Sequence, residues 1–160
     1  PMNKALNDLI ERYPDLAVCK EDIFSAFELM CKCYRGNGKI LTCGNGGSAA
    51  DSEHIVAELM KGFNSTRALP STVKDIISSL FPDDGDYLGS HLQGALPAIA
   101  LTSNSTLNTA FANDVAPDMI FAQQVYGYGN QGDVLIGLST SGNSVSVLRA
   151  LQSARGKEMV

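Results

Sequence analysis

Residues 39–48 read KILTCGNGGS and join a short apolar run to a glycine-rich turn. The run from Lys39 to Cys43 has the length of a buried strand, and residues 49–62 after the turn have apolar side chains at helical spacing. Ser48 and Asp51 have the spacing of a capping box for that helix. A strand that leads through a tight turn directly into a helix is typical of parallel α/β sheets.

Two further apolar runs repeat this arrangement. Residues 96–101 (LPAIAL) and 133–138 (DVLIGL) predict buried strands, and helical patterns follow at about 106–111, 118–126 and 145–154. Continuously apolar strands that alternate with helices indicate a parallel sheet covered on both faces. We therefore expect an α/β fold with a doubly wound parallel sheet, of the flavodoxin-like or Rossmann-like kind.

The sequence as a whole predicts a single domain over residues 1–160, with N-terminal helices in 1–35 and the α/β core in 36–160. An excursion at about 64–94 has a weaker pattern, with one short helix expected near 73–80. Three strands are few for a doubly wound sheet, and another strand and helix would begin near Val160. We therefore expect the C-terminal part of the fold to be missing from this chain.

Composition and charge narrow the classes of partner. The formal net charge is -5 and no Lys/Arg cluster is present, which argues against nucleic acid. No apolar run is long enough to cross a membrane, and the first residues lack the pattern of a signal peptide. We expect a cytoplasmic protein with buried, reduced thiols at its four cysteines, which are Cys19, Cys31, Cys33 and Cys43.

Two strand-to-helix turns, residues 43–48 and 139–144 (STSGNS), have the chemistry of phosphate loops. A helix N-terminus attracts anions, glycines let the backbone approach, and hydroxyls add neutral donors. Glycine and serine are also ordinary turn and capping residues, but one serine would suffice for a cap. The predicted phosphate-binding residues are Asn45, Gly46, Gly47, Ser48, Ser139, Thr140, Ser141 and Ser144.

A nucleotide is the alternative ligand for the first turn. Gly44, Gly46 and Ala49 meet a relaxed dinucleotide fingerprint, but no strand ending in an acidic residue follows about 20 residues later. The turn also lacks the Lys-Ser/Thr ending of a P-loop. A serine-rich cluster suits the phosphomonoester of a small molecule better than a pyrophosphate.

The two turns resemble the phosphosugar loops of the sugar isomerase (SIS) domain family. Residues 43–51 are similar to its first loop and residues 139–144 to its serine-rich second loop, and the closest likeness is to its phosphoheptose isomerase branch. The resemblance implies an SIS fold and aldose–ketose isomerisation of a sugar phosphate, namely sedoheptulose 7-phosphate to a heptose 7-phosphate through an enediol. It also implies a homo-oligomer, a tetramer in the family.

His54 and Glu58 lie four residues apart on the helix after the first loop, so they share one face. From spacing alone this is most often a solvated pair. The resemblance implies that His54 is a zinc ligand, and that Glu58 is a zinc ligand and a substrate contact. A carboxylate is a suitable base for proton transfer next to a carbonyl, so Glu58 is also the candidate catalytic base. Zinc depends on a further Gln and His, which would lie beyond Val160. Asn113 and Asp114 resemble the family's substrate-contacting pair.

Two noncatalytic functions remain as alternatives. Some SIS proteins are adaptors for a replication initiator, but such relatives tend to lose the residues that are present here as Glu58 and Ser141. A phosphosugar sensor would keep the phosphate loops without turnover. Lys61-Gly62 replaces a Gly-Arg pair common in phosphoheptose isomerases, which leaves the sugar open, and His91 is expected to be a surface residue.

Overall fold

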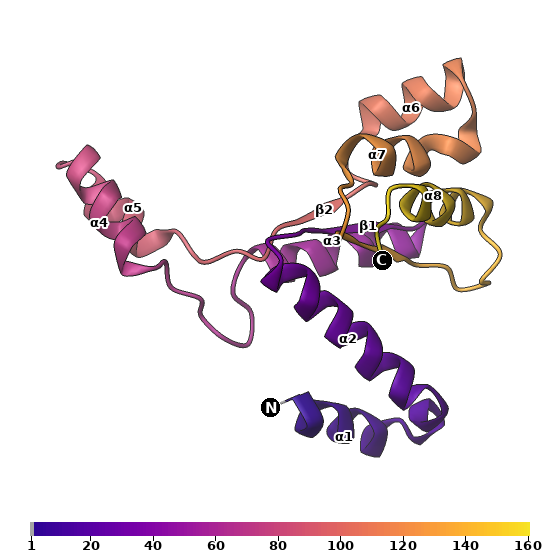
Figure 1. Ribbon diagram of the computed structural model, residues 1–160, viewed down its shortest axis with the longest axis horizontal. Helices are drawn as coiled ribbons and strands as arrows, with labels where there is room; N and C mark the ends of the chain where they lie inside the picture. The colour runs from indigo at the N-terminus through magenta and orange to yellow at the C-terminus, as the bar shows by residue number, and fades with distance from the viewer. Residues whose placement is uncertain (1) are drawn as a thin grey trace.

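The computed structural model describes residues 2–160, with side chains from Lys4 onward. Its sheet is parallel with strand order β2-β1-β3, and the strands are β1 (Ile40–Cys43), β2 (Ala98–Ala100) and β3 (Val134–Gly137) (Figure 1). Ile40 of the central strand pairs with Ala98 on one side and with Val134 on the other. All of β1 is buried, as its unbroken apolar pattern predicts.

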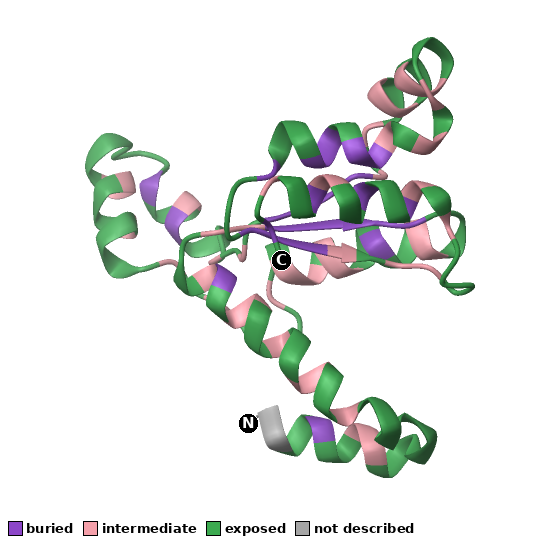
Figure 2. Cartoon of the chain, turned by 45° about the vertical axis from the view of Figure 1, so that its right-hand side comes forward, coloured by how far each residue is buried: buried purple, intermediate pink, exposed green. Residues whose placement is uncertain are grey.

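Helices cover both faces of the sheet. On one face, α2 (Lys20–Arg35) and α3 (Gly47–Met60) pack around Cys33 and Ile40. On the other, α7 (Ile120–Tyr128) and α8 (Val145–Gly156) surround Val125, and burying such a side chain stabilises the fold by about 1.5–3 kcal/mol. Figure 2 shows the buried strands between these two helical layers. The expected doubly wound α/β fold is confirmed.

Because all three strands point the same way, the sheet has a carboxyl end and an amino end. The strands run parallel and continue through short turns into α3 and α8, so both turns lie at the carboxyl end of the sheet. The far end of α3 lies near the start of β2, because the Leu59 carbonyl accepts a hydrogen bond from the Leu96 amide at 3.0 Å. Helix α3 therefore spans the sheet from one end to the other.

An ion pair between the buried Asp133 and the partly exposed Lys39 lies at the amino end of the sheet. Asp133, only 2% exposed, accepts hydrogen bonds from the Lys39 ammonium at 2.5 Å, the Lys39 amide at 2.9 Å and the Asn130 amide at 2.8 Å. Burial alone would raise the pKa of Asp133, but these hydrogen bonds and the Lys39 charge hold that pKa below its ordinary value. The carboxylate is thus fully engaged within the chain.

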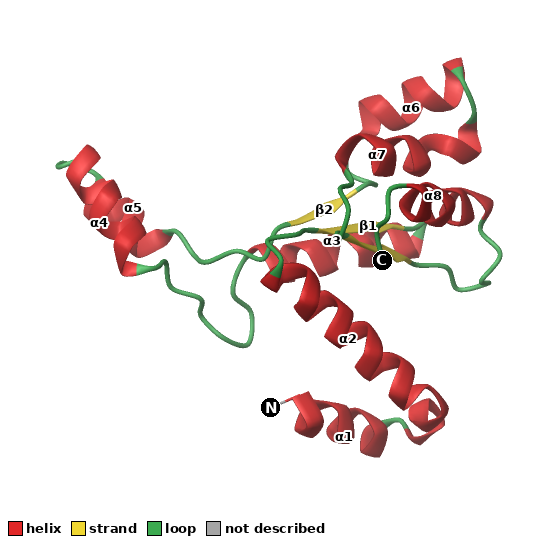
Figure 3. Ribbon diagram, in the orientation of Figure 1, coloured by secondary structure: helices red, strands yellow, loops and turns green. Residues whose placement is uncertain are grey.

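The excursion forms a pair of helices that projects from the body, α4 (Ser71–Leu80) and α5 (Gly85–His91) (Figure 3). Helix α4 matches the expected short helix, whereas α5 begins at Gly85, in a stretch for which no helix was expected. His91 is exposed, as expected. The other helices are α1 (Met2–Arg12), the 3-10 helix η1 (Pro14–Cys19), α6 (Ser105–Asp114) and the 3-10 helix η2 (Pro117–Met119).

The cysteines differ in their surroundings. All four are free, and Cys33 and Cys43 are buried, with burial raising the pKa of Cys43 to about 12. Cys19 is exposed and Cys31 is partly so, and the expectation of four buried thiols is therefore wrong for these two. Within residues 2–160, no helix has the length and apolar character that a bilayer crossing needs.

Candidate functional site

The two strand-to-helix turns meet through one side chain. The Asn45 amide donates to the Ser144 hydroxyl at 2.9 Å and to the Ser146 hydroxyl at 3.0 Å. Asn45 belongs to the turn after β1, and the two serines lie at the start of α8, after β3. Residues about a hundred positions apart in sequence are therefore held together at the carboxyl end of the sheet.

A small cavity of about 140 Å³ lies between the turns, and none of its lining side chains is charged. Its lining consists of Asn45, Ser48, Leu138, Ser139, Thr140, Ser141 and Ser144. We call this group the cradle. Hydroxyl and amide groups that converge on one cavity can donate hydrogen bonds to an anion from several directions.

The helix starts beside the cradle are not capped by side chains. The N-cap of α3 is Gly46, which has no side chain. The N-cap of α8 is Ser144, whose side chain accepts no capping hydrogen bond. The expected capping box of Ser48 and Asp51 is therefore wrong, because α3 begins one residue before Ser48. At α6, by contrast, Asn104 caps the helix by accepting from the Leu107 amide at 3.1 Å. No side-chain cap competes with an anion at α3 or α8.

Two glycines explain why the first turn has its sequence. A Cβ on Gly44 would lie 2.6 Å from the Ser48 carbonyl oxygen, so no side chain fits there. Gly46 has φ of 58°, a left-handed conformation that favours glycine. Gly46 thus shapes the entry to α3, and neither Gly46 nor Gly47 lines the cavity. Ser146 was not predicted, although its spacing of two residues from Ser144 was visible in the sequence.

His54 and Glu58 form a second group on α3. The His54 Nε2 atom lies 3.5 Å from Glu58 Oε1, and the two side chains are 77% and 29% exposed. Glu58 Oε2 is buried and has no hydrogen-bond partner. An imidazole nitrogen and a carboxylate oxygen without a partner are donors that zinc accepts. They are two ligands only, because residues 2–160 contain no cluster of three or more candidate ligands.

The cradle and Glu58 lie at opposite ends of α3. Ten residues separate Ser48 from Glu58, or about 15 Å along the helix axis at 1.5 Å per residue. Asn113 and Asp114 lie elsewhere, exposed at the end of α6 and hydrogen-bonded to each other at 2.8 Å. The chain thus gathers the side chains of the predicted phosphate ligands at the cradle but does not bring them together with Glu58, and Asn113 and Asp114 are not in the cavity lining.

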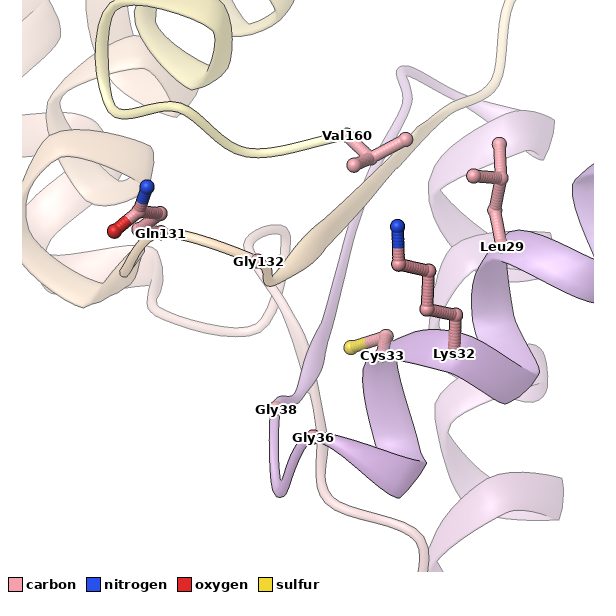
Figure 4. A pocket seen from close by; sticks show the side chains of 8 residues that line it. All are labelled: Leu29, Lys32, Cys33, Gly36, Gly38, Gln131, Gly132 and Val160. Carbon is pink, nitrogen blue, oxygen red and sulfur yellow. The ribbon is translucent and has the colours of Figure 1, made fainter.

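A second cavity of about 230 Å³ lies at the amino end of the sheet, between α2 and the start of β3 (Figure 4). Lys32 is the one charged residue in its lining, which also includes Leu29, Cys33 and Val160. None of the predicted site residues lines it. The candidate site therefore remains at the carboxyl end, in the cradle.

Comparison with known proteins places this geometry in a family. The model of the SIS domain matches residues 4–75 and 76–160. The chain belongs to the SIS domain family. The resemblance inferred from the two turns is therefore confirmed, and the cradle is the part of this SIS fold where the two matching loops meet.

Relatives of this SIS protein include phosphoheptose isomerases. It is 42% identical over 135 residues to a phosphoheptose isomerase of Chlorobaculum parvum, which covers 84% of this chain and 53% of that protein. A phosphoheptose isomerase of Synechocystis is 39% identical, covering 84% of this chain and 56% of the relative. The chain thus spans little more than half the length of these relatives.

Solved structures agree with the fold. The structure of a phosphoheptose isomerase from Neisseria gonorrhoeae has a TM-score of 0.65 and 34% identity, covering 97% of this chain and 64% of that one. A phosphoheptose isomerase from Francisella tularensis has a TM-score of 0.66 and 28% identity, covering 97% and 72%. Both similarities extend over almost all of this SIS chain.

Proposed function

We propose that this SIS protein isomerises a sugar phosphate, interconverting sedoheptulose 7-phosphate and a heptose 7-phosphate aldose. The observation that carries the proposal is the Asn45 bridge to Ser144 and Ser146, which joins the glycine-rich start of α3 to the serine-rich start of α8 around one cavity. The names of the relatives support the choice of a heptose phosphate.

The cradle binds the phosphate ester. Its hydroxyls and the starts of α3 and α8 offer neutral donors and two positive dipole ends. Because no cation lines the cavity, the ester is held by hydrogen bonds that depend on its position. The phosphate therefore anchors one end of the sugar and leaves the carbonyl end free to reach the catalytic group.

Glu58 is the base in the proposed reaction. It takes a proton from C1 of the ketose while the C2 oxygen gains one, which gives an enediol; C2 then gains a proton and the C1 hydroxyl loses one, which gives the aldose. A carboxylate suits such a relay, and the unpartnered Oε2 of Glu58 has no internal donor to compete with the substrate. Asn113 and Asp114 are proposed as further substrate contacts.

The position of Glu58 favours a homo-oligomer. Because the cradle and Glu58 lie at opposite ends of α3, we propose that a second copy brings its Glu58 to the cradle of the first. Exposed apolar residues around η1, among them Tyr13 and Val18, offer a surface for such an assembly. A tetramer agrees with the resemblance to the family.

His54 and Glu58 would hold zinc, with the remaining ligands outside residues 2–160. Zinc at these side chains would polarise the carbonyl oxygen of the sugar. We further propose that residues 1–160 form a single SIS domain, with N-terminal helices in 1–35 and the core in 36–160. A cytoplasmic location follows from the substrate, because a phosphate ester does not cross membranes unaided.

Isotope exchange tests the reaction. Sedoheptulose 7-phosphate deuterated at C1 should lose deuterium to water and yield an aldose when incubated with the protein. The Glu58→Gln variant should bind the sugar phosphate without exchange. Tight binding with no exchange by the wild-type protein would contradict the isomerase and favour a phosphosugar sensor or an adaptor.

Mixed oligomers test the shared site. Glu58→Gln lacks the base, and Ser141→Asp places a negative charge in the cradle, so each variant alone should be inactive. Coexpression of the two should restore part of the activity, because some sites then combine an intact cradle with an intact Glu58. A monomer by light scattering, or no restored activity in mixed oligomers, would contradict a site shared between copies.

A further inference from the structure

Arg67 closes the C-terminal end of α3. Its Nη2 group donates to the Leu59 and Lys61 carbonyls, each at 2.7 Å, and to the Glu58 carbonyl at 3.3 Å. The last carbonyls of a helix have no partner within it, and a cation near them is favourable. Lys61 ends the helix in an extended conformation, so no left-handed glycine cap serves these carbonyls. Arg67 supplies donors to these carbonyls from outside the helix, and at the Leu59 carbonyl it does so together with the Leu96 amide.

The same side chain also ties the two ends of the excursion together. Arg67 Nε donates to the Gly94 carbonyl at 2.9 Å, and the Gly94 amide donates to the Arg67 carbonyl at 2.7 Å. Ala68 and Gln93 form an antiparallel bridge next to this pair, and the Gly62 amide donates to Gln93 Oε1 at 2.7 Å. We call this set of contacts the neck. Arg67 is the member of the neck that reaches the α3 carbonyls.

We propose that Arg67 is a positioning residue for Glu58. By holding the carbonyls of Glu58 and Leu59, it fixes the helical turn from which the Glu58 carboxylate projects. This inference rests on the proposed function, in which Glu58 is the base. Because Glu58 Oε2 has no hydrogen-bond partner, the placement of the carboxylate depends on its own backbone and on the 3.5 Å contact with His54.

The guanidinium is suited to this role in a way that an ammonium is not. Arginine presents several donors in a rigid plane, so Nη2 and Nε of Arg67 bind carbonyls on both α3 and residue 94 at once. A lysine at position 67 would keep the charge but would lose this simultaneous contact. A displacement of about 1 Å at a catalytic group can slow a reaction about a hundredfold. Turnover should therefore respond to a change that conserves charge.

Kinetics of three variants test the role of Arg67. Arg67→Lys should lower kcat at least tenfold, while KM and the dissociation constant for inorganic phosphate at the cradle stay within twofold of wild type. Added guanidinium should restore part of the turnover of Arg67→Ala. Gln93→Ala is the matched control, because it removes a neck contact without touching the α3 carbonyls, and its kcat should stay within twofold.

Other results would overturn the proposal. A smaller loss of kcat in Arg67→Lys, or an equal loss of kcat and phosphate affinity, would show that Arg67 does not act through the placement of Glu58. If Gln93→Ala lowered kcat as much as Arg67→Lys does, the effect would belong to the neck as a whole and not to Arg67. Failure of both Arg67 variants to fold would make Arg67 a residue for stability alone.

Amide hydrogen exchange separates this proposal from the proposed function. A wild-type protein without turnover would contradict the isomerase, and exchange would still measure the hold of Arg67 on α3. In Arg67→Lys, amides at 57–61 should exchange at least tenfold faster, while those at 47–50 keep their wild-type rates. Unchanged exchange at 57–61 would overturn the positioning role whether or not the protein is an isomerase.

Discussion

The carboxylates of Asp133 and Glu58 differ in how their oxygens are hydrogen-bonded. Asp133 is nearly inaccessible, and both of its oxygens accept hydrogen bonds from Lys39 or Asn130. Glu58 is more exposed, yet its Oε2 atom is buried without any partner. A buried acceptor without a partner costs about 1–3 kcal/mol. Glu58 Oε2 shares this condition with the Ser52 hydroxyl, but a carboxylate oxygen carries charge and a hydroxyl does not. The comparison supports the proposal that Glu58 serves a ligand, whereas Asp133 serves stability.

Glu58→Gln should have the largest effect on turnover, and it tests the contrast between the two carboxylates most directly. Removing a general base slows catalysis about 10²–10⁴-fold, so we expect turnover to fall about 10³-fold. Stability to urea should not decrease, because the lost charge has no complete set of partners. Glu28→Gln, an exposed change on α2, is the control. A loss of stability with turnover intact would reverse the roles assigned to the two carboxylates.

Lys39→Met should damage stability and not chemistry. Removing one partner of a fully buried ion pair costs about 3–5 kcal/mol, and we expect about 3 kcal/mol or less because Lys39 is 21% exposed and Asp133 keeps two backbone donors. Urea unfolding measures this loss, and turnover of the folded protein should remain at the wild-type level. Lys32→Met, at an exposed site on α2, should unfold within about 0.5 kcal/mol of wild type.

The pH dependence of stability sharpens the contrast. Because the pKa of Asp133 is lowered in the folded protein, its stabilising contribution is complete above the unfolded value of about 3.9 and is lost as pH falls below it. The free energy of unfolding should therefore decline as the pH falls from about 4 through the lowered pKa of Asp133 in the folded protein. Asp133→Asn should show a shallower decline than wild type. Equal slopes would mean that Asp133 titrates alike in both states.

Asn45→Ala should have the smallest effect. It removes the two hydrogen bonds that join the turns, and we expect about tenfold weaker binding of the sugar phosphate, or about 1.4 kcal/mol. Calorimetric titration with sedoheptulose 7-phosphate measures the change, with Asn64→Ala in the excursion as the control. Unchanged affinity would show that the cradle keeps its shape without the bridge.

The fold was readable from sequence where local pattern and burial agree. The apolar runs around Leu41, Ile99 and Leu135 predicted the three strands, and the turns after the first and third predicted the helix starts beside the cradle. Helix α5 was missed because Asp84 and Gly85 are turn residues by local preference, and packing against α4 decides otherwise.

The site was readable only in part, because some contacts have no local signal. The turns predicted the residues that gather at the cradle, but Arg67 binds carbonyls, which every residue carries, so nothing in the sequence marked its partners. The separation of Glu58 from the cradle follows from the length of α3 and was open to calculation from spacing. The roles of His54, Asn113 and Asp114 stay predictions.

The neck has a consequence for how the gene for this chain can be edited. Ala68 and Gln93 face each other as bridge partners, and directly opposed residues of an antiparallel pair lie only about 5 Å apart. A tight reverse turn can span this distance, and the two termini of many small domains also lie close together. The segment between residues 68 and 93, which contains α4 and α5, could therefore be replaced by a reporter domain or an affinity tag without a change in the sheet.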